Sequence, residues 1–422
     1  MIERAIAEAV LRDVIAACDP AARVRDALHE PEVVARLAGR GRYAIAIGKA
    51  ALAMARGAGE VVAGLAVVPR GGGGELPGGW RVVEGSHPVP DELSVAAGRE
   101  LQSFVAGVPA AGVIIALLSG GASALAELPL VPLDELVATV RDVMAAGAAI
   151  DEINAVRGAL SAIKAGRLVQ AAAAPVITLA VSDVIGDTLA VIGSGPTVGP
   201  WLASPGVAVA DDAASRRSRA RAILERHGLA VPPLLAADAD SAGEPHAGAV
   251  TRTDYADVIA AMSSAAYFAV RYLALRVTEA TLSVAPVEGD VAAVAQMLVD
   301  RQAGAATAIV AWGEPTLRVP AGHGVGGRAQ QLALTLARHL RGGELSALVV
   351  GTDGIDGPPP LDRPAPAGAW IDGTTWDAII AAGRDPAAAL AGCDAGTALH
   401  AVGALVVTGA TGINHADLVI IG

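Results

Sequence analysis

Lysine is nearly absent from this chain: of its 31 lysines and arginines only two, Lys49 and Lys164, are lysine. An ammonium group is a compact point charge whose pKa responds to its surroundings, whereas guanidinium is a planar fork. A lysine kept on an arginine-rich background is therefore a candidate for chemistry that arginine does not perform. Lys49 follows an apolar run at a predicted strand-to-helix junction, and Lys164 lies on a predicted helix ten residues after Asn154. The alternative is that a biased composition leaves two lysines by chance.

Small polar residues and glycines follow predicted strands at five points. The clusters are Gly48-Lys49, 119–123, Ser182-Asp183, Gly313-Glu314 and 351–354. Ligands of open α/β sheets bind beyond the carboxyl ends of the strands, so five such clusters indicate a binding site. Any single cluster would be explained equally well by ordinary turn chemistry.

The cluster at 119–123 is the most glycine-rich one after a buried strand. Backbone amides at Ser119, Gly120, Gly121 and Ser123 could cradle an anion at the start of a helical stretch. A tight turn without a ligand is the alternative interpretation. His87 comes four residues before a predicted helix N-cap, Asp91, and could face the same site.

Two carboxylates, Asp183 and Asp187, stand four residues apart after a predicted buried strand. Mg²⁺ prefers oxygen ligands and is commonly held by one or two carboxylates, so this turn is a candidate magnesium anchor. Asp353, at another strand end, is a third candidate metal ligand. The turn 193–197, which contains Gly195, places small polar groups shortly after the two carboxylates.

The segment Gly322–Arg328 formally matches the dinucleotide pattern G-x-G-x-x-G, between a predicted strand and a predicted helix. The preceding strand is short and polar, however, whereas a dinucleotide fingerprint follows an apolar first strand. The best first strand of this chain ends in Gly48-Lys49-Ala50, which is not that fingerprint, and no Walker-type phosphate loop occurs in the sequence. Arg328, placed behind glycines at a helix start, suits phosphate contact better than a hydride carrier.

Length and composition limit the class of protein. A chain of 422 residues exceeds the usual size of a single core, so we expect two domains. The net charge of −12 argues against nucleic-acid binding, which needs a basic surface. Two distant cysteines and the absence of a signal peptide fit a reducing cytoplasm. Pro109 and several glycines interrupt the uncharged stretch 101–126, so its apolar part, 113–118, is a predicted buried strand and not a membrane span.

Short β-branched runs alternate with alanine-rich stretches, which predicts a parallel sheet covered on both faces. The composition changes between residues 193 and 253, where we expect the domain connection, giving domains 1–250 and 251–422. The predicted strands are 42–47, 65–68, 80–83, 113–118, 176–181, 280–284, 307–312, 316–319, 345–350, 404–407 and 417–421, and the predicted helices are 49–62, 91–104, 134–148, 151–172, 212–227, 255–275, 291–303 and 328–340.

Taken together, the motifs resemble those of the type-2 glycerate kinases, whose C-terminal half is the MOFRL domain. They keep the family order over nearly the whole chain. The matching segments are 47–51, 87–91, 118–125, 153–157 with 160–168, 182–187 with 192–197, 324–328 with Gln330, 351–357 and 408–412.

The resemblance implies an α/β protein with an N-terminal Rossmann-like domain and a C-terminal MOFRL-type domain, and an active site in the cleft between them. The implied reaction is ATP-dependent phosphorylation of the 2-hydroxyl of D-glycerate with Mg²⁺. The partners would be a small hydroxy acid and a nucleotide, with no nucleic acid or membrane, in a cytoplasmic monomer or homodimer. If groups from both halves serve one transfer, the domains must close on the substrate.

Carried over by motif, Lys49 and Arg328 are the central cations, and Asp183 is a metal ligand or base. Two alternatives stay open: an NAD(P)H-dependent hydroxypyruvate reductase, and a specialised kinase or binding protein for another hydroxy acid. The metal ligands would come from Asp183, Asp187 and Asp353. The implied substrate- and nucleotide-binding residues are Gly48, His87, Ser119, Gly120, Gly121, Ser123, Asn154, Arg157, Lys164, Gly195, Glu314, Gly326, Gly327 and Gln330.

Several family motifs are altered, mostly in the C-terminal half. The usual GGRNQE is GGRAQQ at 326–331, which loses an amide and an acid beside Arg328. The usual GGETT is WGEPT at 312–316, and the usual GGGSAL is GGASAL at 120–125. These departures predict either an acceptor other than glycerate or a reduced activity.

Overall fold

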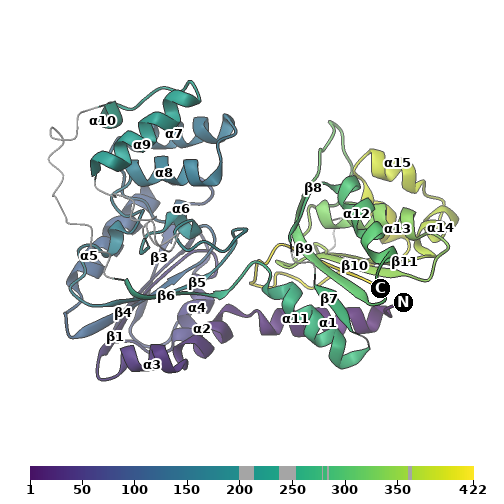
Figure 1. Ribbon diagram of the computed structural model, residues 1–422, viewed down its shortest axis with the longest axis horizontal. Coiled ribbons are helices and arrows are strands. Elements are labelled where there is room, and N and C mark those ends of the chain that lie inside the picture. The colour runs from purple at the N-terminus through teal and green to yellow at the C-terminus, as the bar shows by residue number, and fades with distance from the viewer. Residues whose placement is uncertain (199–212, 237–252, 278, 283–284, 360–363) are drawn as a thin grey trace. The chain divides into compact units, whose positions relative to one another are not determined.

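The computed structural model describes residues 1–198, 213–236, 253–277, 279–282, 285–359 and 364–422 (Figure 1). The chain forms two compact units. The N-terminal unit is Pro20–Ala260, and the C-terminal unit combines Met1–Asp19 with Ala261–Gly422. The expected boundary at residue 250 lies outside the described residues. No helix within the described ranges is long and apolar enough to cross a membrane.

The N-terminal unit is built on six parallel strands in the order β3-β2-β1-β4-β5-β6. Every residue of β4 and β5 is buried, as expected for central parallel strands covered on both faces. The strand order reverses between β1 and β4, which makes their carboxyl ends the topological switch point of the sheet. The strands are β1 Gly41–Ile47, β2 Ala63–Pro69, β3 Trp80–Gly85, β4 Gly112–Leu118, β5 Val176–Val181 and β6 Thr253–Ala260.

Helices cover both faces of this sheet. On one face α2 (Pro20–Leu28), α3 (Pro31–Leu37) and α4 (Ala51–Ala58) pack their apolar side chains, and on the other lies α5 (Glu92–Gly107). The predicted N-cap of α5 is confirmed, because the Asp91 carboxylate accepts hydrogen bonds from the backbone N–H groups of Leu93 and Ser94.

A group of helices follows β4 and β5 and has a small core of its own. In Figure 1 these helices gather together above the sheet of their unit. The group consists of α7 (Leu133–Ala145), α8 (Ile150–Leu160), α9 (Ala213–Arg226) and α10 (Pro233–Ala236), while the short α6 (Ala122–Leu125) lies directly after β4.

Two predicted helices were wrong. The helix expected at 151–172 ends at Leu160, because Ser161 is extended and Gly166 has a φ of 78°. Lys164 therefore lies in a turn, before the 3-10 helix Arg167–Val169. The helix expected at 255–275 is divided into β6 and α11 (Ser264–Arg276). Pairing with β5 overrides the helical preference of this alanine-rich segment.

The C-terminal unit has a mixed sheet in the order β12-β11-β10-β13-β9-β7, with β8 paired to β9. The last strand, β13, is antiparallel to both neighbours and sits between β9 and β10. The predicted strand at 316–319 is wrong, since β9 ends at Thr316. The strands are β7 Ala280–Leu282, β8 Val287–Asp290, β9 Ala308–Thr316, β10 Ser346–Gly351, β11 Gly368–Asp372, β12 Leu405–Val406 and β13 Asp417–Ile421.

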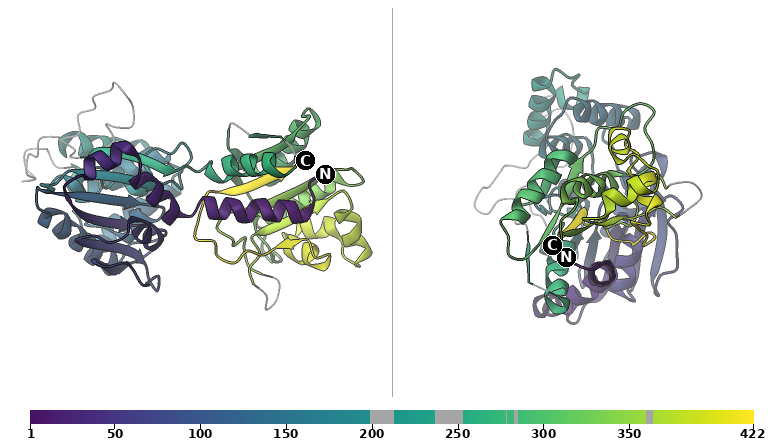
Figure 2. Two further views of the ribbon diagram at one scale, coloured as in Figure 1. Left: turned by 90° about the horizontal axis from the view of Figure 1, so that it is seen from below. Right: turned by 90° about the vertical axis from the view of Figure 1, so that its right-hand side faces the viewer.

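The helix α1 (Arg4–Ala17) packs with α11 on one face of this sheet, as Figure 2 shows from below. The opposite face is covered by α12 (Val291–Ala303), α13 (Arg328–Leu340), α14 (Thr375–Ala381), α15 (Pro386–Ala391) and α16 (Ala395–Ala401). The predicted two-domain α/β fold is thus confirmed, with a parallel and a mixed sheet.

Candidate active site

The loops that follow β1 and β4 are joined by hydrogen bonds at the switch point of the N-terminal sheet. The backbone N–H of Lys49 donates to the carbonyl of Gly120 at 2.8 Å, and that of Ser119 donates to the carbonyl of Ile47 at 3.0 Å. The Ser119 hydroxyl accepts from the backbone N–H of Ala50 at 3.1 Å. Ser119 therefore orients the start of α4, and the two loops form one rigid base.

Two glycines allow side chains from other strand ends to reach this base. A Cβ built on Gly120 would lie 2.1 Å from Oδ2 of Asp183, which follows β5. Gly121 has a φ of 85°, and a Cβ there would lie 3.1 Å from Cδ2 of His87 and 3.3 Å from Cγ of Lys49. Any larger residue at either position would displace these groups. Lys49, His87 and Asp183, predicted separately from the sequence, therefore meet around one glycine pair.

Lys49 is exposed, and among the described residues it forms no ion pair. Its ammonium protons are thus available to an anion. Partial burial and the Lys49 charge lower the pKa of His87, so the imidazole is neutral at neutral pH. A neutral histidine beside an ammonium can hydrogen-bond a ligand without adding charge. This combination suits an anionic ligand at the switch point.

Lys164 has a different environment from Lys49. Its side chain is only 2% exposed, and Nζ donates to the carbonyls of Ser123 at 2.8 Å and Ala126 at 3.0 Å and lies 3.4 Å from Oε2 of Glu127. The three ammonium protons therefore all have protein acceptors. Burial lowers the pKa of Lys164, opposed by the Glu127 carboxylate, and the nearby Arg157 charge lowers it further. In the structure Lys164 holds α6 and the residues after it, and its predicted ligand contact stays a prediction.

A chain of polar side chains links α6 to α8. The Ser194 hydroxyl donates to Oδ1 of Asn154 at 2.8 Å and lies 2.8 Å from Oγ of Ser123. Since the single Ser194 proton goes to Asn154, the Ser123 hydroxyl donates to Ser194. Ser194 and Gly195 have φ values of 61° and 58°, which create the turn that presents Ser194. Ser194 was absent from the predicted set and is the residue that joins its members.

Arg157, also predicted to bind a ligand, lies mainly inside the helical group. Burial lowers its pKa, and the Glu127 charge opposes this effect. One of its Nη2 contacts is Sδ of Met144 at 3.8 Å. The ion-pair partner of the buried Glu127 carboxylate is therefore Lys164, while Arg157 and Glu127 interact through their charges at longer range.

The predicted metal ligands do not form a three-residue cage, because no group of three or more His, Cys, Asp or Glu side chains suited to a metal occurs in the described ranges. Asp183 and Asp187 belong to the N-terminal unit and Asp353 to the C-terminal unit. Mg²⁺ is usually held by one or two carboxylates, with substrate phosphates and waters completing its shell. Asp183, next to Lys49 and Gly120, fits that mode of binding.

In the C-terminal unit Arg328 is held by a buried carboxylate. Nε and Nη2 of Arg328 donate to Oδ2 and Oδ1 of Asp417 at 2.6 and 3.0 Å, and Glu314 lies 3.7 Å from Nη2. Burial, together with the charges of Asp356 and Glu314, raises the pKa of Asp417 to about 6 against the opposing effect of Arg328. This bidentate bond fixes the plane of the guanidinium and leaves Nη1 for another acceptor.

Gly327, directly before Arg328, makes room for a carboxylate of the protein itself. Asp356 accepts from the backbone N–H groups of Ala329 at 2.9 Å and Gln330 at 2.7 Å, and so caps α13. A Cβ on Gly327 would lie 2.3 Å from Oδ1 of Asp356. Gln330 is fully buried and donates through Nε2 to Asp356. Gly327 thus makes room for Asp356, and Gln330 donates to it, while a Cβ on Gly326 would meet the backbone N of Gly396 at 2.8 Å. The ligand contacts predicted for Gly326, Gly327 and Gln330 stay predictions.

The remaining predicted residues of this unit, Asp353 and Glu314, are exposed at the strand ends. One oxygen of Asp353 accepts from the backbone N–H of Ile355 at 3.0 Å. The family departures at Ala329 and Gln331 are buried, and Gln331 donates to the carbonyl of Leu390 at 2.8 Å. Those two substitutions therefore change internal packing and leave Arg328 and its carboxylate in place.

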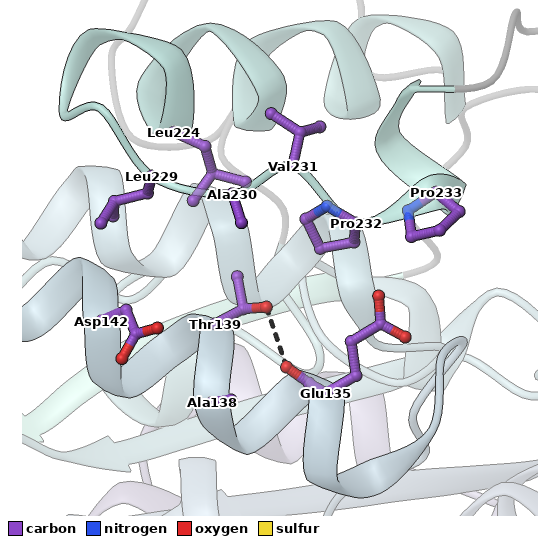
Figure 3. Close-up of a pocket in the computed structure, with 10 residues that line it drawn as sticks. All are labelled: Glu135, Ala138, Thr139, Asp142, Leu224, Leu229, Ala230, Val231, Pro232 and Pro233. Carbon is purple, nitrogen blue, oxygen red and sulfur yellow. Dashed lines mark hydrogen bonds between the residues drawn. The ribbon is translucent and has the colours of Figure 1, made fainter.

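Two cavities of the helical group differ in their relation to these residues. One, of about 230 Å³, lies between α7 and the segment after α9 and contains no predicted site residue (Figure 3). Its Thr139 hydroxyl donates to the Glu135 carbonyl at 2.8 Å, within α7. The other, of about 390 Å³, lies between α8 and α9 and is lined by Asn154 and Ser194. Of these two cavities only the second is lined by a predicted site residue, Asn154.

Comparison with known proteins agrees with this geometry. Residues 6–236 match the family model described as Domain of unknown function (DUF4147), and residues 307–417 match the MOFRL family. D-glycerate 2-kinase of Thermotoga maritima is 34% identical over 399 residues, which cover 89% of each chain. A protein of Agrobacterium vitis provisionally named a hydroxypyruvate reductase is 35% identical over 366 residues, covering 83% of this chain and 79% of its own. The crystal structure of glycerate kinase from T. maritima matches 99% of this chain and 98% of its own with a TM-score of 0.82 and 28% identity. The chain therefore belongs to the glycerate kinase family.

Proposed function

We propose that this protein is an ATP-dependent kinase that phosphorylates the 2-hydroxyl of D-glycerate, or of a related small 2-hydroxy acid, in the cytoplasm. The observation that carries the proposal is Lys49: an exposed ammonium that forms no ion pair with any residue the structure describes, at the switch point of a parallel sheet, beside Asp183 and His87. Family membership supports the same reaction class.

Phosphoryl transfer needs positioning and neutralisation of charge more than covalent catalysis. Lys49 would place a point charge on the transferring phosphoryl group, where charge develops in the transition state. Asp183 would either help to hold Mg²⁺, which would supply positive charge to neutralise the phosphates, or accept the proton of the attacking hydroxyl. His87, kept neutral by burial and by the Lys49 charge, would donate a hydrogen bond to the same anion.

Arg328 would bind the carboxylate of the hydroxy acid or a phosphate. Its Nε and Nη2 are committed to Asp417, so Nη1 is the group that would contact the ligand. Guanidinium forks suit carboxylate and phosphate geometry. That Lys49 of one unit and Arg328 of the other act in one transfer stays a prediction, as does closure of the units around the substrate.

The reductase alternative has less support. A dinucleotide fingerprint needs a glycine-rich first βα turn, and the turn after β1 is Gly48-Lys49-Ala50. Gly327, the last glycine of the formal pattern before α13, makes room for Asp356, whose carboxylate accepts from the helix N-terminus that a pyrophosphate would need. A different hydroxy-acid acceptor is the better second candidate, because the family motifs change in the C-terminal half.

A coupled ADP-release assay with Mg²⁺ tests the proposal across glycerate, hydroxypyruvate, tartronate and sugar acids. We expect ADP release with one of the hydroxy acids, none without an acceptor, and none with Lys49→Ala. Phosphorus NMR of the product identifies the phosphorylated hydroxyl. Oxidation of NADH by hydroxypyruvate without ADP release would refute the kinase function.

A further inference from the structure

The cavity between α8 and α9 has the size and lining of a ligand site. Its volume is about 390 Å³, within the range of roughly 300–1,000 Å³ typical of small-molecule sites. Ala155, Val191 and Ile223 supply apolar wall, while Asn154 and Ser194 supply polar groups. Helix α9 carries no family motif, so the motifs in the sequence predict no cavity at this position.

One face of α9 brings arginines to this cavity. Arg216, Arg219 and Arg226 line it and are spaced by three and seven residues, which places them along one side of a helix. Two acids, Asp151 and Glu152, also line it, so the lining carries one more positive than negative charge in a chain of net charge −12.

Among the described residues, Arg219 is the cation of this cavity whose charge has no partner. Arg226 is hydrogen-bonded to Glu152, and His227 also contacts that carboxylate at 3.2 Å. Arg219 forms no hydrogen bond or ion pair with any described side chain. An uncompensated guanidinium beside apolar wall favours an anionic ligand with an apolar part.

The polar side of the cavity is connected through side-chain hydrogen bonds to the loop that lies beside Lys49, His87 and Asp183. Asn154 lines the cavity, and its Nδ2 is buried without a hydrogen-bond partner. Its Oδ1 accepts a hydrogen bond from Ser194, which is also hydrogen-bonded to Ser123. Ser123 belongs to the loop whose Gly121 lies beside Lys49. The segment after β5 also joins the two places, since it begins at Asp183 and continues to Ser194 at the cavity.

We infer that this cavity binds the nucleotide donor, with Arg219 and Arg216 on its phosphates and the apolar wall against its base. The inference rests on the proposed kinase function and names the nucleotide subsite within it. A small hydroxy acid has little apolar surface and would leave Ala155, Val191 and Ile223 without a partner. A nucleoside triphosphate supplies both the anionic and the apolar surface that the lining requires.

Isothermal titration of the full chain with a non-hydrolysable ATP analogue and Mg²⁺ tests the inference. Arg219→Gln removes the uncompensated charge, and Arg221→Gln, the same change on the same helix outside the cavity lining, is the matched control. Loss of a charge-assisted hydrogen bond should raise Kd roughly tenfold to a hundredfold in Arg219→Gln. The control should stay within about twofold, and melting temperatures verify that both variants are folded.

A second variant, Ala155→Leu, narrows the cavity without changing charge. It should raise KM for ATP and weaken binding of the ATP analogue, while KM for the hydroxy acid stays at the parent value. Binding of inorganic pyrophosphate should be weakened by Arg219→Gln but unchanged by Ala155→Leu. Parent-like nucleotide binding in both variants, or an effect confined to the hydroxy acid, would overturn the inference while leaving the kinase function intact. A parent protein that binds no nucleotide would instead overturn the kinase function and the inference together.

Discussion

The buried Asp417 carboxylate makes the stability of the C-terminal unit depend on pH. Its pKa is raised from 3.8 to about 6, a difference of about two units. The folded state therefore holds the proton more tightly than the unfolded chain does. The stability due to this group is fully present below pH 3.8 and is lost as the pH rises through about 6. At about 1.4 kcal/mol per unit the loss amounts to about 3 kcal/mol.

Asp417→Asn removes this titration while keeping the size of the side chain. Arg328 stays charged over the whole range, so its altered contact adds only an offset that does not vary with pH. The free energy of unfolding of the variant, relative to the parent, should therefore increase by about 3 kcal/mol between pH 4 and pH 7.5. At neutral pH the variant should also lose kcat/KM, because Asn no longer holds the Arg328 fork in its plane.

Hydrogen exchange of peptides from β10 and β13, followed by mass spectrometry, reports on this unit alone. Comparing parent and variant at equal pH cancels the intrinsic pH dependence of amide exchange. A difference between parent and Asp417→Asn that stays constant with pH would refute the argument that burial dominates the energetics of this carboxylate.

Four further predictions follow from the N-terminal unit. Lys49→Arg keeps the charge but should lower kcat roughly a hundredfold at an unchanged melting temperature; near-parent turnover would make Lys49 a structural residue. Lys164→Met should destabilise the unit by about 3–5 kcal/mol in urea unfolding, because Glu127 is left buried and unpaired, and adding Glu127→Gln should restore much of the loss. In NMR titrations His87 should have a midpoint below 6.5 that rises in Lys49→Ala, and an unmoved midpoint would contradict their coupling. Turnover should stop in excess EDTA and return with Mg²⁺, and Asp183→Asn should be the most damaging carboxylate change; full activity in EDTA would exclude metal dependence.

The N-terminal sheet was predictable because its central strands are buried on both faces. Such strands are continuous apolar runs in the sequence, and 113–118 and 176–181 correspond to β4 and β5 within one residue. The edge strand β6 was not predictable in this way. It begins an alanine-rich stretch, 255–275, whose composition favours a helix, and pairing with β5 makes its first part a strand. The end of α8 was missed for a related reason, since Ala165 and Gly166 adopt positive φ in contact with the turn 194–195.

The sequence by itself determined which residue types follow each strand, and hence that Lys49, His87 and Asp183 lie near the carboxyl ends of parallel strands. It did not distinguish the two lysines, which differ only in what surrounds them: Lys49 is exposed and forms no ion pair within the described ranges, and Lys164 is enclosed by three acceptors. It also did not show that Gly327 makes room for Asp356, or that Asp417, 89 residues after Arg328, holds the Arg328 fork. Periodicity and spacing report neighbours along the chain, whereas burial and charge compensation depend on groups that only folding brings together. For that reason the availability of each cation to a ligand was decided by the tertiary structure.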